Sequence, residues 1–155
     1  MIIIRDTREK YGWSFEAYPD IDIIDKKLQA GDYTIQGCES SIIIERKSSV
    51  TEIANNLGKD YARFCREFDK LSTRCKKYIV CEFEYSELAN FPKGANIPDA
   101  LKAKIRVSGN FLKYRVLELE QKYYIKFVFA GSRDNAENET FKILSEYNET
   151  ENASF

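Results

Sequence analysis

The segment that most constrains the fold is Ile42–Lys47, three isoleucines followed directly by Glu, Arg and Lys. β-Branched residues favour strands, and a strand that is apolar on both faces must be covered on both sides. We therefore expect this strand in the centre of a sheet. Its charged end is unusual, because unpaired buried charge costs several kcal/mol, and ion partners or a metal ion are expected there.

Other segments alternate between strand and helix patterns. Strands are predicted from β-branched and aromatic residues at 2–5, 22–28, 32–35, 77–84 and 124–130. Helices are predicted from apolar side chains at helical spacing at 51–72 (with Thr51 as N-cap), 98–119 and 135–147. Strands that alternate with helices indicate the α/β class, a sheet flanked by helices. One domain is expected at residues 1–148, followed by a short acidic tail at 149–155.

Composition excludes several classes of protein. The chain has no histidine, so a Ser-His-Asp hydrolase is impossible. Its four cysteines form no C-x-x-C pair, and free thiols are expected rather than a zinc site. No apolar run approaches the roughly 20 residues that cross a bilayer, and the apolar start meets Arg5 and Asp6 at once, unlike a signal peptide. We expect a cytoplasmic protein with no membrane partner.

The net charge of −1 is unevenly distributed. Residues 134–155 contain six acidic residues and one basic residue, which leaves 23 basic against 19 acidic residues in the first 133. This distribution permits nucleic-acid binding without indicating it by itself.

Two carboxylates are predicted to meet beside the central strand. Asp32 begins the preceding strand, and Glu45 lies near the end of Ile42–Lys47. A divalent cation would relieve their repulsion, and oxygen ligands without His or Cys favour Mg²⁺ or Mn²⁺. Alternate side chains share a face, so Lys47 points with Glu45, and Arg46 points the other way. This set suits phosphodiester hydrolysis, although isolated surface Glu and Lys residues are commonly only solvated.

Three motifs follow in order along the chain: Asp6-Thr7-Arg8-Glu9, Gly31-Asp32-Tyr33 and Glu45-Arg46-Lys47-Ser48. Together they resemble the nuclease domain of the XPF-type structure-specific endonucleases, in the restriction-endonuclease-like PD-(D/E)XK superfamily. The resemblance covers nearly the whole chain. It implies a central mixed β-sheet flanked by α-helices, and a Mg²⁺- or Mn²⁺-dependent endonuclease that cuts flaps, forks and other branched or partly single-stranded DNA. A homodimer is also implied, since family members often pair.

The resemblance also implies roles for individual residues. Asp32 and Glu45 would hold the metal, Asp6 would be a further ligand or lie beside it, and Lys47 would face the scissile phosphate. Arg8 and Arg46 would orient carboxylates or contact phosphate, with internal ion pairing as the alternative. The last Asp of the family pattern falls at Thr51, beside Glu52. If that Asp helps catalysis, Thr51 reduces activity unless Glu52 substitutes.

Basic and aromatic side chains suggest where DNA could bind. One stripe at helical spacing consists of Lys59, Arg63, Arg66 and Lys70, and a second of Lys102, Arg106 and Lys113. Either stripe could instead be an ordinary solvated face. Tyr11, Trp13 and Phe15 could stack on an unpaired base or form part of the core.

Three alternatives to an active branched-DNA endonuclease remain. The chain could be a catalytically weak DNA-binding or scaffold subunit of the same fold. It could be another nuclease of the superfamily, such as a restriction or recombination enzyme. It could also be a metabolic α/β domain, although it has no phosphate-cradling glycine-rich loop.

Overall fold

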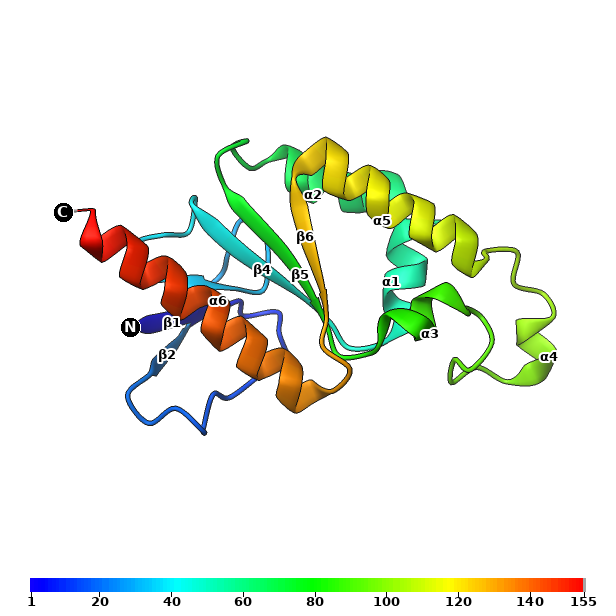
Figure 1. Ribbon diagram of the computed structural model, residues 1–155, viewed down its shortest axis with the longest axis horizontal. Coiled ribbons are helices and arrows are strands. Elements are labelled where there is room, and N and C mark those ends of the chain that lie inside the picture. The colour runs from blue at the N-terminus through cyan, green and yellow to red at the C-terminus, as the bar shows by residue number, and fades with distance from the viewer. Residues whose placement is uncertain (155) are drawn as a thin grey trace.

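A computed structural model describes residues 1–154, which form one six-stranded sheet with helices on both faces (Figure 1). The strands are β1 (Ile2–Arg5), β2 (Asp22–Asp25), β3 (Tyr33–Ile35), β4 (Ile42–Lys47), β5 (Lys76–Cys81) and β6 (Ile125–Phe129). The helices are α1 (Val50–Leu57), α2 (Tyr61–Asp69), α3 (Tyr85–Ala89), α4 (Asp99–Lys102), α5 (Gly109–Tyr123) and α6 (Arg133–Ala153).

The sheet is mixed and has the strand order β2-β1-β3-β4-β5-β6. β3 runs antiparallel to both of its neighbours, and all other pairs are parallel. The expected α/β class with a central mixed sheet is confirmed. The isoleucines of β4 are at most 1% exposed, so this strand is central, as its apolar run predicts.

Two apolar cores cover the two faces of the sheet. Ile43 and Ile79 face one core, which α1, α2, α3 and α5 complete. Ile42, Ile44 and Val80 face the other, which contains the buried face of α6 and the N-terminal loop. Figure 1 shows α6 on one side of the sheet and α1, α2 and α5 on the other. Within the described residues no helix has the length and apolar composition of a bilayer span.

The single helix predicted at residues 51–72 is wrong, because the chain forms two helices with a break at Gly58. Glycine is a poor helix former, and here it ends α1 with φ −94° and ψ −107°. Thr51 is also not the N-cap. Ser49 caps α1 by accepting a hydrogen bond from the backbone N–H of Glu52 at 3.2 Å.

The helix predicted at 98–119 is likewise divided, into α4 and α5. α5 begins at Gly109 with Ser108 as N-cap, where a Cβ on Gly109 would collide with the Ala89 carbonyl of α3. The close approach of α3 and α5 therefore sets this start, and local periodicity does not reveal it. Leu101, predicted on the buried stripe, is half exposed.

The end of the chain also differs from the prediction. α6 continues to Ala153, so residues 149–153 extend a helix instead of forming a tail. Residue 155 of the predicted tail lies outside the described residues. The four cysteines are free thiols, as expected.

Candidate active site

Asp32 lies directly before β3, opposite Glu45 of β4. The register pairs Tyr33 with Ile44, which brings Asp32 level with Glu45 on the neighbouring strand. The Asp32 backbone N–H donates to the Ile44 carbonyl at 2.7 Å, and the Asp32 Oδ2 accepts from the Arg46 N–H at 2.7 Å. These two bonds hold the Asp32 carboxylate against the charged end of β4.

Gly31 makes this approach of the chain to β4 possible. Its φ is +77°, a conformation that side-chain-bearing residues rarely adopt. A Cβ there would lie 3.0 Å from the Ile43 Cβ and 3.2 Å from the Ile44 carbonyl oxygen. The glycine of the Gly31-Asp32 motif thus serves both the turn and the packing that position Asp32.

Lys47 is a buried cation between two carboxylates. Its Nζ donates to Glu45 Oε1 at 2.9 Å and lies 3.5 Å from Glu52 Oε1, while its side chain is only 6% exposed. Burial by itself lowers the pKa of Lys47, but the charges of Glu45 and Glu52 outweigh it and raise the pKa above its ordinary value. Lys47 is therefore an ammonium group at neutral pH.

Asp32 is in an environment that disfavours its charge. Burial raises the pKa of Asp32 well above its ordinary value, and the nearby charges of Glu45 and Glu9 raise it further. The Arg46 N–H and the charge of Lys47 oppose this rise without cancelling it. Two carboxylates that repel each other in a buried place are stabilised when a cation lies between them.

The donor set fits a hard divalent cation. Within residues 1–154, no group of three or more His, Cys, Asp or Glu side chains could hold a metal ion. The carboxylates that the strand register brings together are those of Asp32 and Glu45. Mg²⁺ commonly binds through one or two carboxylates and keeps waters or phosphate oxygens in its other positions. The residues present therefore fit Mg²⁺ or Mn²⁺ better than zinc.

Asp6 is occupied by protein donors. Its carboxylate accepts from the Leu28 N–H at 2.7 Å and from the Arg8 N–H and Nε at 2.8 and 2.6 Å. Its own N–H donates to the Asp32 carbonyl at 2.8 Å. This arrangement supports a positioning role for Asp6 beside the site. Arg8 itself is 61% exposed and free to meet a ligand with its outer edge.

Arg46 lies on the opposite face of β4 from Glu45, as the strand period predicts. Its Nε donates to Glu82 Oε1 at 2.8 Å, its Nη1 to Glu9 Oε2 at 3.3 Å, and its guanidinium lies 5.7 Å from the Trp13 ring centre. With 10% exposure, the Arg46 side chain forms internal ion pairs, which was the alternative to phosphate contact.

Sequence reasoning missed Glu82 as a partner in this cluster. Its Oε1 also accepts from Trp13 Nε1 at 2.9 Å and from Arg133 Nη1 at 3.4 Å, so it joins three separate segments. One signal in the sequence was available: Glu82 directly follows the apolar end of β5. The last residue of β5, Cys81, pairs with Lys47 on β4, so Glu82 lies at the same end of the sheet as the site.

The expected basic stripe is not one helix face. Lys59 lies in the turn between α1 and α2, whereas Arg63 and Arg66 lie on α2. Arg63 pairs with Asp60 at 3.3 Å, and Lys70 pairs with Glu67 at 3.1 Å. The second stripe is also divided between α4, the loop after it and α5. Trp13 and Phe15 are buried, so of the three aromatics only Tyr11 is free to stack.

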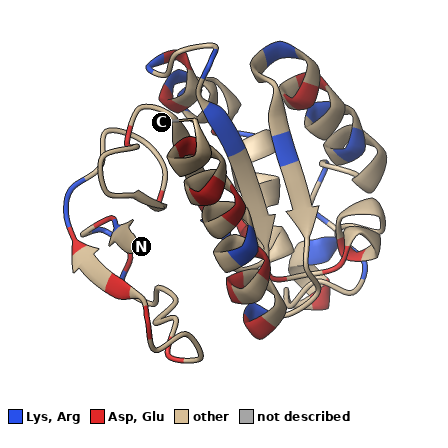
Figure 2. Cartoon of the chain, turned by 60° about the vertical axis from the view of Figure 1, so that its left-hand side comes forward, with Lys and Arg blue, Asp and Glu red and all other residues tan. Residues whose placement is uncertain are grey.

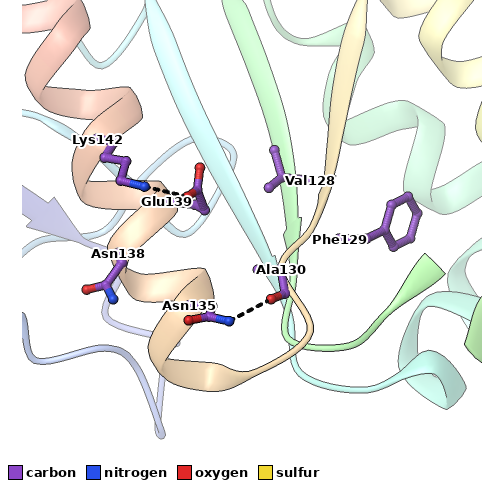
Figure 3. Close-up of a pocket in the computed structure, with 7 residues that line it drawn as sticks. All are labelled: Val128, Phe129, Ala130, Asn135, Asn138, Glu139 and Lys142. Carbon is purple, nitrogen blue, oxygen red and sulfur yellow. Dashed lines mark hydrogen bonds and ion pairs between the residues drawn. The ribbon is translucent and has the colours of Figure 1, made fainter. Parts of the chain in front are cut away.

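The structure has hollows near the sheet, among them one next to this region and one away from it. One, of about 480 Å³, lies at the ends of β4 and β5 and includes Ser48, Thr51 and Glu82 in its lining. Another, of about 410 Å³, lies between β6 and α6 (Figure 3). Neither Asp32 nor Glu45 lines it, and its one lining carboxylate, Glu139, is paired with Lys142 at 2.8 Å.

Solved structures share this fold. XPF from Aeropyrum pernix in complex with DNA superimposes with a TM-score of 0.67 at 18% identity, covering 96% of this chain and 66% of that one. XPF from Aeropyrum pernix gives 0.65 at 19% identity, covering 92% and 64%. The chain thus spans just under two thirds of these structures. No protein-family model and no curated protein sequence matches it. The XPF-type fold is confirmed.

Proposed function

We propose that this chain, with its XPF-type fold, is a divalent-metal-dependent DNA endonuclease that cleaves branched or partly single-stranded DNA. One observation carries the proposal: Asp32 and Glu45 face each other on adjacent strands, with the buried ammonium of Lys47 bound to Glu45 at 2.9 Å. Two carboxylates and a lysine at one strand end form a set suited to phosphodiester hydrolysis.

Asp32 and Glu45 would hold Mg²⁺ or Mn²⁺. Such an ion lowers the pKa of a water molecule and polarises a phosphate oxygen. The side chains of this chain supply the rest. Lys47 stays protonated, so it acts as a fixed positive charge that stabilises negative charge growing on the phosphate, and it is not a general base.

Backbone and carboxylate contacts from two sides hold the pair in place. The Arg46 N–H fixes the Asp32 carboxylate, while the Asp6 N–H fixes the Asp32 carbonyl. Asp6 is therefore proposed as a positioning residue, and Arg46 is proposed to act through its backbone N–H, while its side chain pairs with Glu82 and Glu9. Arg8, through its exposed side, is the proposed phosphate contact beside Asp32.

The replacement of the last motif Asp by Thr51 is compatible with activity. Glu52, one residue later, lies 3.5 Å from Lys47 Nζ and accepts from the Ser48 N–H at 2.9 Å. A carboxylate therefore still supports Lys47 from the start of α1. The same replacement is the observation that favours the second candidate function, a DNA-binding subunit with weak catalysis.

DNA is the proposed substrate because of the fold and the basic residues near the site. XPF from Aeropyrum pernix was solved in complex with DNA. Arg8 and Arg66 are exposed and are proposed to contact the phosphate backbone, and Lys59, Arg63 and Lys70 remain proposed supporting contacts. A homodimer is part of the proposal and is tested by the molar mass in solution.

The test compares cleavage of labelled flap, fork and duplex DNA in Mg²⁺, in Mn²⁺ and in EDTA. We expect the native chain to cut flaps and forks only with metal, and Asp32→Asn and Glu45→Gln each to abolish cutting. Glu16→Gln, at an exposed carboxylate without a side-chain partner among residues 1–154, is the matched control and should cut normally. DNA binding without cleavage in any metal would support the scaffold subunit and reject the enzyme.

A further inference from the structure

A positively charged hollow, separate from the carboxylate pair, lies at the beginning of β5 and β6. A hollow of about 260 Å³ is lined by Lys76, Lys77, Tyr78, Tyr124 and Lys126, three lysines and two tyrosines with no carboxylate. In a chain with more acidic than basic residues, a lining of this composition is selective for anions. Figure 2 shows lysines as blue bands on the two neighbouring strands beside α6.

The strand register places the exposed lysines on one face. Tyr78 pairs with Lys126, and Lys76 lies two residues before Tyr78, so all three side chains share a face. Strand geometry separates Tyr78 from Lys126 by about 4.8 Å across the two strands. It separates Lys76 from Tyr78 by roughly 6.6 Å along β5. Glu45 lies on the other face, because Ile79, with which it pairs, contacts the opposite core.

Aromatic rings hold these lysines and leave their donors free. Lys126 Nζ lies 5.7 Å from the centre of the Tyr78 ring, and Lys76 Nζ lies 5.0 Å from that of Tyr147 in α6. Within residues 1–154 neither lysine pairs with a carboxylate. The two ammonium groups are therefore held beside aromatic rings, and within the described residues no carboxylate neutralises them.

Two further residues complete the hollow. Lys77 is buried and donates to the Ser72 and Cys75 carbonyls at 3.1 and 3.0 Å, which adds a fixed positive charge that nothing acidic in the lining offsets. Tyr124 caps α5 in the left-handed conformation, φ 57°, and the residue is 72% exposed. An open aromatic ring beside cationic groups is the arrangement that stacks a base while its phosphates are held.

We propose that this hollow binds one nucleotide of a single-stranded nucleic acid, with the flanking phosphates on Lys76 and Lys126 and the base on Tyr124. Binding here does not require the carboxylate pair, so the inference goes beyond the proposed cleavage. For a nuclease, such a site would hold a single strand on the sheet face opposite the carboxylates.

The first test measures binding of fluorescein-labelled dT8 to the whole chain in EDTA by fluorescence anisotropy over a series of NaCl concentrations. Lys76→Glu with Lys126→Glu should raise Kd at least about tenfold and lower the log–log salt slope by roughly 1.4, the value for two phosphate contacts on a single strand. Tyr124→Ala should raise Kd by about fivefold or more, the lower end for one stacked base.

Lys93→Glu with Lys104→Glu is the matched control, because both lysines are exposed, unpaired among residues 1–154 and outside the hollow. It makes the same charge change and should leave Kd within about twofold. If the control weakens binding as much as the Lys76 and Lys126 variant does, only the general field of the protein acts, and the proposal is overturned.

A second measurement uses the native protein and so does not depend on whether a variant folds. Titration with dT8 should move the NMR amide signals of residues 76–78 and 124–126. Inorganic phosphate at the same concentration should leave the signal of Tyr124 in place. Shifts confined to other surfaces, or equal shifts with phosphate alone, would contradict a nucleotide site. Asp32→Asn with Glu45→Gln should keep full dT8 affinity, which separates this result from any failure of cleavage.

Discussion

The Lys47 ammonium lies 2.9 Å from Glu45 Oε1, and both residues lie on the same face of the central strand. This contact is the local consequence of a two-residue strand period. It fixes Lys47 beside the carboxylate proposed to hold the metal and keeps its charge out of water.

Lys47→Met should remove cleavage while leaving DNA binding nearly unchanged. The variant keeps the length of the side chain but loses the charge proposed to stabilise the transition state, and a lost donor of this kind lowers kcat by about 10²- to 10³-fold. Single-turnover cleavage in Mg²⁺ and anisotropy in EDTA measure the two properties. Equal losses of cleavage and binding would place Lys47 in the DNA interface instead.

Gly31→Ala should destabilise the fold and lower cleavage. Gly37→Ala is the control, because its φ of +85° imposes similar backbone strain, while a Cβ there would meet nothing within 4 Å. Backbone strain alone lowers the free energy of unfolding by about 1–3 kcal/mol. The Gly31 variant should lose more stability than this, because its Cβ crowds Ile43 and Ile44. Urea unfolding compares the two. Equal losses would mean that the crowding against β4 is relieved without cost.

Asp6→Asn should destabilise the protein at neutral pH. Burial alone would raise the pKa of Asp6, but its hydrogen bonds from Arg8 and Leu28 outweigh burial and lower the pKa below the ordinary 3.8. The charged carboxylate therefore stabilises the fold above about pH 4, and this stabilisation disappears as pH falls through the lowered pKa.

The measurement for Asp6 is the free energy of unfolding of the native chain and of Asp6→Asn between pH 3 and pH 8. The difference should be constant above about pH 5 and should shrink below about pH 4. A difference that grows as the pH falls would show that the Asp6 pKa is raised, contrary to its contacts.

Glu82→Gln should destabilise the protein by about 1–3 kcal/mol, because its charged hydrogen bonds to buried Arg46 and Trp13 are weakened. Glu16→Gln, at an exposed carboxylate, should change the unfolding free energy by less than about 0.5 kcal/mol. Thermal unfolding compares both with the native chain. An unchanged midpoint for Glu82→Gln would show that Arg46 is held by Glu9 alone.

The strand period and the apolar run allowed much of the site to be predicted from sequence. They gave the central position of β4 and the opposite directions of Lys47 and Arg46, because these depend only on adjacent residues. The partners of Arg46 were not predictable in the same way. Glu9 and Glu82 lie 37 and 36 residues away, and only the folded sheet brings them together.

The helix breaks show the other limit. The apolar stripe from Ile53 to Phe68 keeps its spacing across Gly58, so periodicity alone favoured one long helix. The start of α5 depends on contact between Gly109 and Ala89 of α3, which is a tertiary constraint. The basic stripe that begins with Lys59 was predicted on one continuous helix. The break at Gly58 leaves Lys59 outside α2, so the stripe is divided.

The most direct test of the carboxylate pair is Mn²⁺ binding, followed by electron paramagnetic resonance with the whole chain and no DNA. We predict one bound Mn²⁺ per native chain and loss of that binding in Asp32→Asn with Glu45→Gln, whereas Glu16→Gln binds as the native chain does. Equal Mn²⁺ binding by the native chain and the double variant, or none by the native chain at millimolar Mn²⁺, would contradict the proposed metal site.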